Sequence, residues 1–242
     1  MPKLGKGTEC VQLLLSQVSK DMHESLVPMF FPILGAQVSE SEFQYPDLSW
    51  KELCGMMGNL VADSGCNKGQ LSNIVEAICH NMREHDNTEL EKLVEWQKQM
   101  KTKSANKEKP ARPDVSFWFP PADVTNAAFI QNAMACEKLG ERTQYLNLPE
   151  VEMADRMCGG HKQISQMLRN IYDRQRSGAL RATVEGVTGN PVLRANLTIS
   201  STPYAARKFY KNELFNGTFG RMMFSFKARM GRDGRIPRQG KY

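Results

Sequence analysis

One stretch of the chain constrains the fold more than any other: residues 58–78 read GNLVADSGCNKGQLSNIVEAI. The run at 54–62 is mostly apolar, which is typical of a strand buried in a parallel sheet. Small and polar residues follow at 63–69, and residues 70–82 repeat apolar side chains at the spacing of one helix face. The stretch therefore predicts a strand, a tight turn and a helix.

The same alternation continues to the end of the chain. Further strands are predicted at 115–119, 144–148, 196–201 and 220–227. Amphipathic helices are predicted at 86–101, 124–138, 161–175 and 204–214. Strands that alternate with helices favour right-handed crossovers and a parallel sheet covered on both faces. We therefore expect an α/β fold, a three-layer sandwich around a mainly parallel five-stranded sheet.

The chain is expected to divide into three segments: 1–50, 51–230 and 231–242. The first is a short helical lead-in, whose amphipathic helix at 8–27 is ended by Pro28 and Pro32. The second is the α/β domain. The third is a basic tail.

Length and composition are those of a globular protein, because 242 residues with 40% hydrophobic content can bury a core. The six cysteines form no C-x-x-C pair, which favours reduced thiols in a cytoplasmic protein. The N-terminal run VQLLL is too short for a secretory signal, and no stretch approaches the roughly 18 apolar residues of a membrane span. We expect a cytoplasmic protein without a membrane partner.

The net charge of +6 is distributed unevenly. Residues 203–242 contain ten Lys and Arg against two acids, which leaves 22 against 24 in residues 1–202. Such a basic segment can bind DNA through its phosphates. The alternative is a cationic surface without a partner.

The turns that follow the strands are where a parallel sheet binds ligands. After the first strand, Lys68 can be aligned with the lysine of the phosphate-binding motif G-x-x-x-x-G-K-[ST]. Ala62, Asn67 and Gly69 then stand where the motif has Gly, Gly and Ser or Thr, while Gly65 keeps the turn small. The alternative is an ordinary strand-to-helix turn with an exposed lysine. Cys66 in this turn is either a small filler or a reactive thiol.

The ends of later strands supply further candidates. Glu150 follows the strand at 144–148, and Glu152 would lie on the same side if the chain is still extended there. A carboxylate at this place can hold magnesium or activate water; the alternative is a carboxylate at a helix entrance. Ser201 and Thr202 can meet a γ-phosphate, or only cap the next helix.

Arg221 opens the last predicted strand, where it can stabilise transferred phosphate charge in its own site or in a neighbour's. A surface arginine is the alternative. Lysine turn, acid, polar strand end and arginine follow one another in the order of a P-loop NTPase. This order predicts ATP and Mg²⁺ as cofactors, with Glu150 as metal ligand. The phosphates would contact Ser64, Gly65, Asn67, Lys68, Gly69, Gln70, Ser201 and Thr202.

Five motifs also resemble a known family: VADSGCNKGQLSNIVEAI, PADVTNAAFIQNA, YLNLPEVE, LRATVEGVTGNPVLRANLTISSTP and NGTFGRMMFSFKAR. The family consists of uncharacterised or helicase-like P-loop ATPase domains of bacterial mobile elements and phages, often linked to a primase domain. The resemblance implies an ATP-binding sheet related to the RecA-like and AAA+ groups. Because the family would be expected to continue past the last strand, the resemblance also implies that this chain is a truncated fragment of a longer protein. Lys68 matches the phosphate-loop lysine and Glu150 the acid after the third strand. Gly69 lacks the hydroxyl that binds magnesium, so nucleotide binding is better supported than hydrolysis.

Two functional hypotheses follow. The first is the ATP-binding domain of a mobile-element DNA replication ATPase, in which Glu150, Glu152 and Arg221 act in catalysis and a homo-oligomeric ring places Arg221 at a neighbour's site. The second is a non-catalytic nucleic-acid-binding or scaffold module on the same sheet. A zinc site is not predicted, because Cys158 and His161 lack the spacing of a finger or ribbon.

Overall fold

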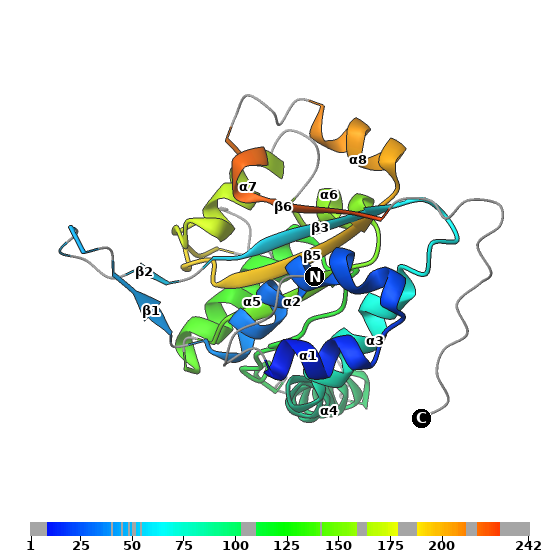
Figure 1. Ribbon diagram of the computed structural model, residues 1–242. Helices are drawn as coiled ribbons and strands as arrows, with labels where there is room; N and C mark the ends of the chain where they lie inside the picture. Colours follow the sequence, from blue (N-terminus) through cyan, green and yellow to red (C-terminus); the bar gives the residue numbers. More distant parts are fainter. Residues whose placement is uncertain are drawn as a thin grey trace.

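Four parallel strands form the central sheet (Figure 1). They are β3 (Met57–Ala62), β4 (Gln144–Leu148), β5 (Ala195–Ser201) and β6 (Met223–Lys227). Their order is β4-β5-β3-β6, and every neighbouring pair is parallel. All four strands therefore end at one edge of the sheet, which we call the carboxyl edge, and begin at the opposite, amino edge.

The structure, a computed structural model, describes most of the chain. The described residues are 9–39, 41–44, 46–47, 49, 52–53, 55–102, 110–140, 142–158, 164–178, 188–211 and 217–227. The expected basic tail at 231–242 lies outside them.

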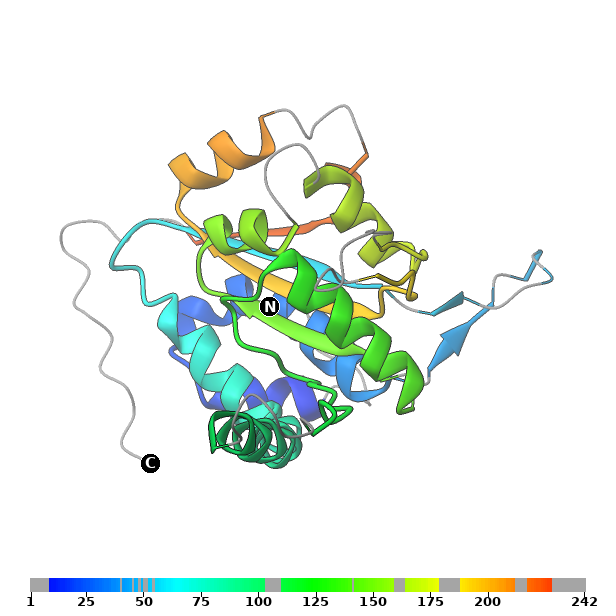
Figure 2. The ribbon, with the colours of Figure 1, turned by 180° about the vertical axis from the view of Figure 1, so that it is seen from behind.

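Helices lie on both faces of the sheet. One face carries α1 (Glu9–Ser16), η1 (Lys20–Met22), α2 (His23–Gln37), α3 (Gly69–Ile78) and α4 (His80–Thr102). The other carries α5 (Asn126–Lys138), α6 (Val151–Cys158), α7 (Ile164–Tyr172) and α8 (Pro203–Tyr210). Figure 1 shows α7 and α8 above the strands and α1 and α3 below them, and Figure 2 shows α5 and α6 from behind. The predicted α/β class and parallel sheet are confirmed. The sheet and the helices on its two faces form the three layers of a sandwich.

Three short elements complete the structure. β1 (Glu42–Phe43) and β2 (Glu52–Leu53) form a separate antiparallel pair, and the 3₁₀ helix η2 (Phe219–Arg221) precedes β6. In Figure 1, β1 and β2 project to one side of the main body. They contribute nothing to the main sheet.

The two faces of the sheet bury two hydrophobic clusters. Successive residues of a strand point to opposite faces. Leu60 accordingly packs in the cluster with α2 and α3, while Val61 packs in the cluster with α5 to α8. Tyr145 and Leu146 divide in the same way. Both faces of the central strands are therefore covered, as the mostly apolar run at 54–62 predicts.

The N-terminal helices belong to this core. Phe30 and Ile33 on α2 are fully buried in the cluster that contains Leu60. The prediction that Pro28 and Pro32 end the first helix is wrong, because both lie inside α2. Burial against the sheet outweighs the cost of about 3 kcal/mol for each interior proline. The described helices of the lead-in expected at 1–50 thus form part of one layer of the sandwich, together with α3 and α4.

The second of the five predicted strands, 115–119, is not a strand of the sheet, so the expected count of five is wrong. Among the described residues, one backbone hydrogen bond joins this segment to β4, from the N–H of Tyr145 to the carbonyl of Trp118 (2.8 Å). A ladder needs such bonds at regular intervals along both strands. The segment contacts β4, the outermost strand on this side of the sheet, without pairing along it.

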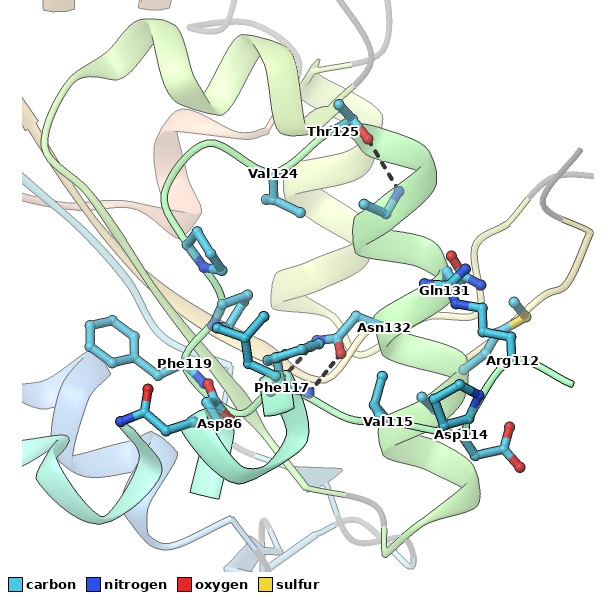
Figure 3. Close-up of a pocket in the computed structure, with 18 of the residues that line it drawn as sticks. Asp86, Arg112, Asp114, Val115, Phe117, Phe119, Val124, Thr125, Gln131 and Asn132 are labelled. Carbon is cyan, nitrogen blue, oxygen red and sulfur yellow. Dashed lines mark hydrogen bonds between the residues drawn. The ribbon is translucent and has the colours of Figure 1, made fainter. Parts of the chain in front are cut away.

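Side chains of two helices hold this segment instead (Figure 3). The buried carboxylate of Asp86 on α4 accepts from the N–H groups of Trp118 and Phe119, at 2.8 and 2.7 Å. Asn132 on α5 accepts from the N–H of Phe117 and donates to its carbonyl, both at 2.8 Å. These bonds satisfy backbone groups that a neighbouring strand would otherwise satisfy.

We expect Asp86→Ala to destabilise the protein by about 2–4 kcal/mol, because it leaves one buried and one partly buried N–H group without a charged acceptor. Urea unfolding followed by circular dichroism measures the loss. Glu91→Ala, an exposed change on the same helix, is the matched control and should cost no more than about 0.5 kcal/mol. Equal costs for the two variants would contradict the role of Asp86.

Candidate functional site

The turn between β3 and α3 has the backbone of a tight, left-handed bend. The N–H of Cys66 donates to the carbonyl of Asp63 (3.3 Å), and Gly65 and Asn67 have φ angles of 80° and 58°. Asparagine is among the few non-glycine residues that adopt this conformation readily. Asn67 therefore takes the backbone shape for which the phosphate-loop motif uses glycine.

The ammonium of Lys68 lies at the carboxyl ends of the two central strands. Its Nζ donates to the carbonyl of Ala62, the last residue of β3, at 3.0 Å and to that of Ser201, the last residue of β5, at 3.3 Å. The side chain is partly buried. This places a positive charge at the crevice where a parallel sheet of this kind binds ligands.

Backbone donors also gather at this turn. The N–H groups of Gln70 and Leu71 donate to the carbonyls of Asn67 and Lys68, which starts α3. Within the described part of the chain, the N–H groups of Asn67, Lys68 and Gly69 have no acceptor. Free N–H groups at a helix start, together with the helix dipole, favour a bound anion.

Gly69 marks the departure from the motif. A Cβ at this position would meet no atom within 4 Å, and the backbone there is not in the left-handed region. Nothing in the fold therefore requires glycine at the first residue of α3. The site lacks a magnesium-binding hydroxyl here, although it has room for one.

Two other predicted residues of the turn lie differently. Ser64 is exposed to solvent. The side chain of Gln70 is buried and faces away from the turn, because its Oε1 accepts from the N–H of Ser19 (2.9 Å) and its Nε2 donates to the Ser19 hydroxyl (2.9 Å). Gln70 joins α3 to the N-terminal layer, so its prediction as a nucleotide contact has no support in this geometry.

The hydroxyls at the end of β5 are both engaged. Ser201 Oγ donates to Asn59 Oδ1 (2.8 Å), and Asn59 Nδ2 donates to the hydroxyl of Tyr210 (2.9 Å). Thr202 caps α8 by accepting from the N–H of Ala205 (3.3 Å). Ser201 thus contacts Lys68 through its backbone carbonyl and not through its hydroxyl. Thr202 caps the next helix, which was the alternative to a γ-phosphate contact.

Asn59 and Tyr210 were missed by the sequence reasoning. Asn59 is fully buried in the middle of β3, and Tyr210 is buried on α8. A buried amide is stable only when its hydrogen bonds are made. The available signal was the single asparagine in the apolar run MGNLVA, since a polar residue inside a central strand needs a partner.

Glu150 lies at the carboxyl edge, two residues after β4. β4 neighbours β5 and not β3, so two strand spacings, roughly 10 Å, separate its end from the end of β3. Glu150 is exposed and makes no ion pair with Lys68. The expectation that Glu152 shares its side of an extended chain is wrong, because α6 begins at Val151 and turns Glu152 away from the strand direction.

Arg221 lies at the opposite edge of the sheet from Lys68. It ends η2 just before β6, whose first residue pairs with Gly58 at the start of β3, so roughly 20 Å of strand separates it from the turn. Its Nε and Nη2 both donate to Asp173 (2.9 Å each), and these hydrogen bonds raise the pKa of Arg221. The prediction that Arg221 belongs to the site of its own chain is therefore wrong. Parallel strands begin at the same end of the sheet, and Arg221 lies at that end, whereas Lys68 lies at the other.

A separate cavity of about 660 Å³ lies between α4, residues 112–125 and α5 (Figure 3). Its lining includes Arg112, Phe117, Phe119 and Val124. None of the predicted site residues lines it. The carboxyl edge at Lys68 and this cavity are thus two different places on the fold.

Metal-ligating side chains do not gather in the described part of the chain, where no group of three His, Cys, Asp or Glu could hold an ion. Burial raises the pKa of the Cys79 and Cys136 thiols to about 12 each, so both stay protonated at neutral pH. Cys66 is the partly exposed thiol of the turn. His161 lies outside the described residues.

Comparisons with known proteins add no support to the resemblance that the sequence motifs suggest. No protein-family model matches the chain, and no relative is found among curated proteins. As for membranes, no helix that the structure describes combines the length and apolarity of a membrane span. What supports a function is therefore the geometry at Lys68.

Proposed function

We propose that this chain is a nucleotide-binding domain that takes ATP at the turn between β3 and α3. The observation that carries the proposal is the position of Lys68 Nζ, which joins the carboxyl ends of β3 and β5 beside free backbone N–H groups. A lysine charge and several backbone N–H donors are what a triphosphate requires. The order of the strand-end residues and the family resemblance point the same way.

Binding of ATP would replace the hydrogen-bond acceptors of the Lys68 ammonium. Lys68 donates to two neutral carbonyls, and a phosphate oxygen is a stronger acceptor because it is charged. On binding, the ammonium would move from Ala62 and Ser201 to the β- and γ-phosphates. The N–H groups of Asn67 and Gly69 would take further phosphate oxygens without losing internal hydrogen bonds.

Hydrolysis would depend on Glu150, the acid that follows β4, the neighbour of β5. Glu150 is exposed at the carboxyl edge, where it can hold a magnesium-bound water or orient the attacking water. Arg221 could reach a phosphate only in another copy, such as the next subunit of a ring. The proposed role is that of a mobile-element DNA replication ATPase in the cytoplasm, helicase-like or primase-associated.

Lys68→Ala should weaken ATP binding at least about 10-fold, because it removes the charge that faces the phosphates. Titration calorimetry with Mg²⁺·ATP measures the affinity. Lys101→Ala, an exposed change at the end of α4, is the matched control and should leave the affinity unchanged. Equal affinities for Lys68→Ala and the parent chain, with both folded by circular dichroism, would overturn the assignment.

Gly69→Ser should strengthen the dependence of ATP binding on Mg²⁺, because it adds the missing hydroxyl at a position with room for it. We expect a several-fold larger ratio between affinities with and without Mg²⁺ than in the parent chain. Gly69→Ala is the control for the change in helix propensity. An identical magnesium dependence in the serine and alanine variants would contradict a phosphate-loop geometry.

A further inference from the structure

One face of α8 gathers cations around an exposed aromatic ring. Tyr204, Arg207, Lys208 and Lys211 follow one another at intervals of three, four and seven residues from the tyrosine, so they share one side of the helix. All four are exposed, and 79% of Tyr204 is accessible. We call these four residues the α8 basic face.

The opposite side of α8 anchors the helix to the sheet. Ala206 and Tyr210 are buried, and Ala205 and Phe209 pack against the same hydrophobic cluster. Figures 1 and 2 both show α8 at the outside of its layer. The α8 basic face is therefore held rigidly and turned outward.

The other cations of the described basic segment are already paired. Arg221 is bound to Asp173, and Lys227 forms an ion pair with Asp21 (3.1 Å). Arg207, Lys208 and Lys211 have no acidic partner among the described residues, and 203–211 contains no acid. The basic excess that faces solvent in this part of the structure is thus concentrated on one helix.

We propose that the α8 basic face binds single-stranded nucleic acid. Three cations without an acidic partner among the described residues lie along one helix face and complement the phosphates of a strand. A strongly exposed ring at their end offers a base a surface for stacking. Bases in a duplex are already stacked on one another, so the ring favours an unpaired strand. The proposal uses no residue of the Lys68 turn and does not rest on nucleotide binding.

Fluorescence anisotropy with a labelled single-stranded DNA of about 20 nucleotides tests the charge contribution in the full chain. The triple variant Arg207→Gln, Lys208→Gln, Lys211→Gln should bind at least about 10-fold more weakly. It should also lower the slope of log Kd against log salt by about 2, because each phosphate contact on a single strand contributes about 0.7. The double variant Lys98→Gln, Lys101→Gln on α4 is the matched control and should change neither quantity.

Tyr204 separates stacking from charge. Tyr204→Ala should weaken binding roughly 5-fold or more without changing the salt slope, whereas Tyr204→Phe should bind like the parent chain. The assays contain no nucleotide, so this test stands whether or not ATP binds at the turn.

Three results would overturn the proposal. The first is a parent chain that does not bind the labelled strand, or binds it no better than duplex DNA or anionic vesicles. The second is an unchanged affinity in the α8 triple variant. The third is that Arg235→Gln, Arg238→Gln, Lys241→Gln abolishes binding while the α8 triple variant keeps it, which would assign the contact to the basic tail.

Discussion

The hydrogen bonds from Lys68 to the carbonyls of Ala62 and Ser201 are the interaction around which the site is arranged. They link the ends of two parallel strands that come from distant parts of the chain. They also keep a cation, partly buried, beside N–H groups that no described residue satisfies. Because the carbonyls are neutral, a phosphate can displace them, and the resting hydrogen bonds hold the lysine near the place where it would act.

Buried polar side chains set the geometry around this lysine. Asn59 ties Ser201 to Tyr210 across the face of the sheet, so the strand end that holds Lys68 is also fixed to α8. The same helix carries the outward-facing cations proposed to bind a nucleic-acid strand. The two proposed ligands would thus meet elements joined through Ser201, with the phosphate turn on one side and α8 on the other.

The alternation of apolar runs was enough to predict the α/β class, the parallel sheet and the strand at 144–148. The apolar pattern at 115–119 predicted a strand that does not form. The pattern of one segment cannot show that the side chains of Asp86 and Asn132 make the hydrogen bonds that a neighbouring strand would make. In the site, Lys68 and Ser201 meet because both follow parallel strands. Arg221 does not, since it precedes its strand. Asn59 and Tyr210 needed the three-dimensional structure.

Alkylation of Cys66 tests the central claim most directly, because this thiol lies in the turn between Gly65 and Asn67. Iodoacetamide labelling of the unmodified chain, followed residue by residue with mass spectrometry, compares Cys66 with the exposed Cys10. We predict that saturating Mg²⁺·ATP slows labelling of Cys66 several-fold and leaves Cys10 unchanged, whereas adenosine, which has no phosphates, protects neither. Equal labelling of Cys66 with and without ATP would contradict phosphate binding at the Lys68 turn.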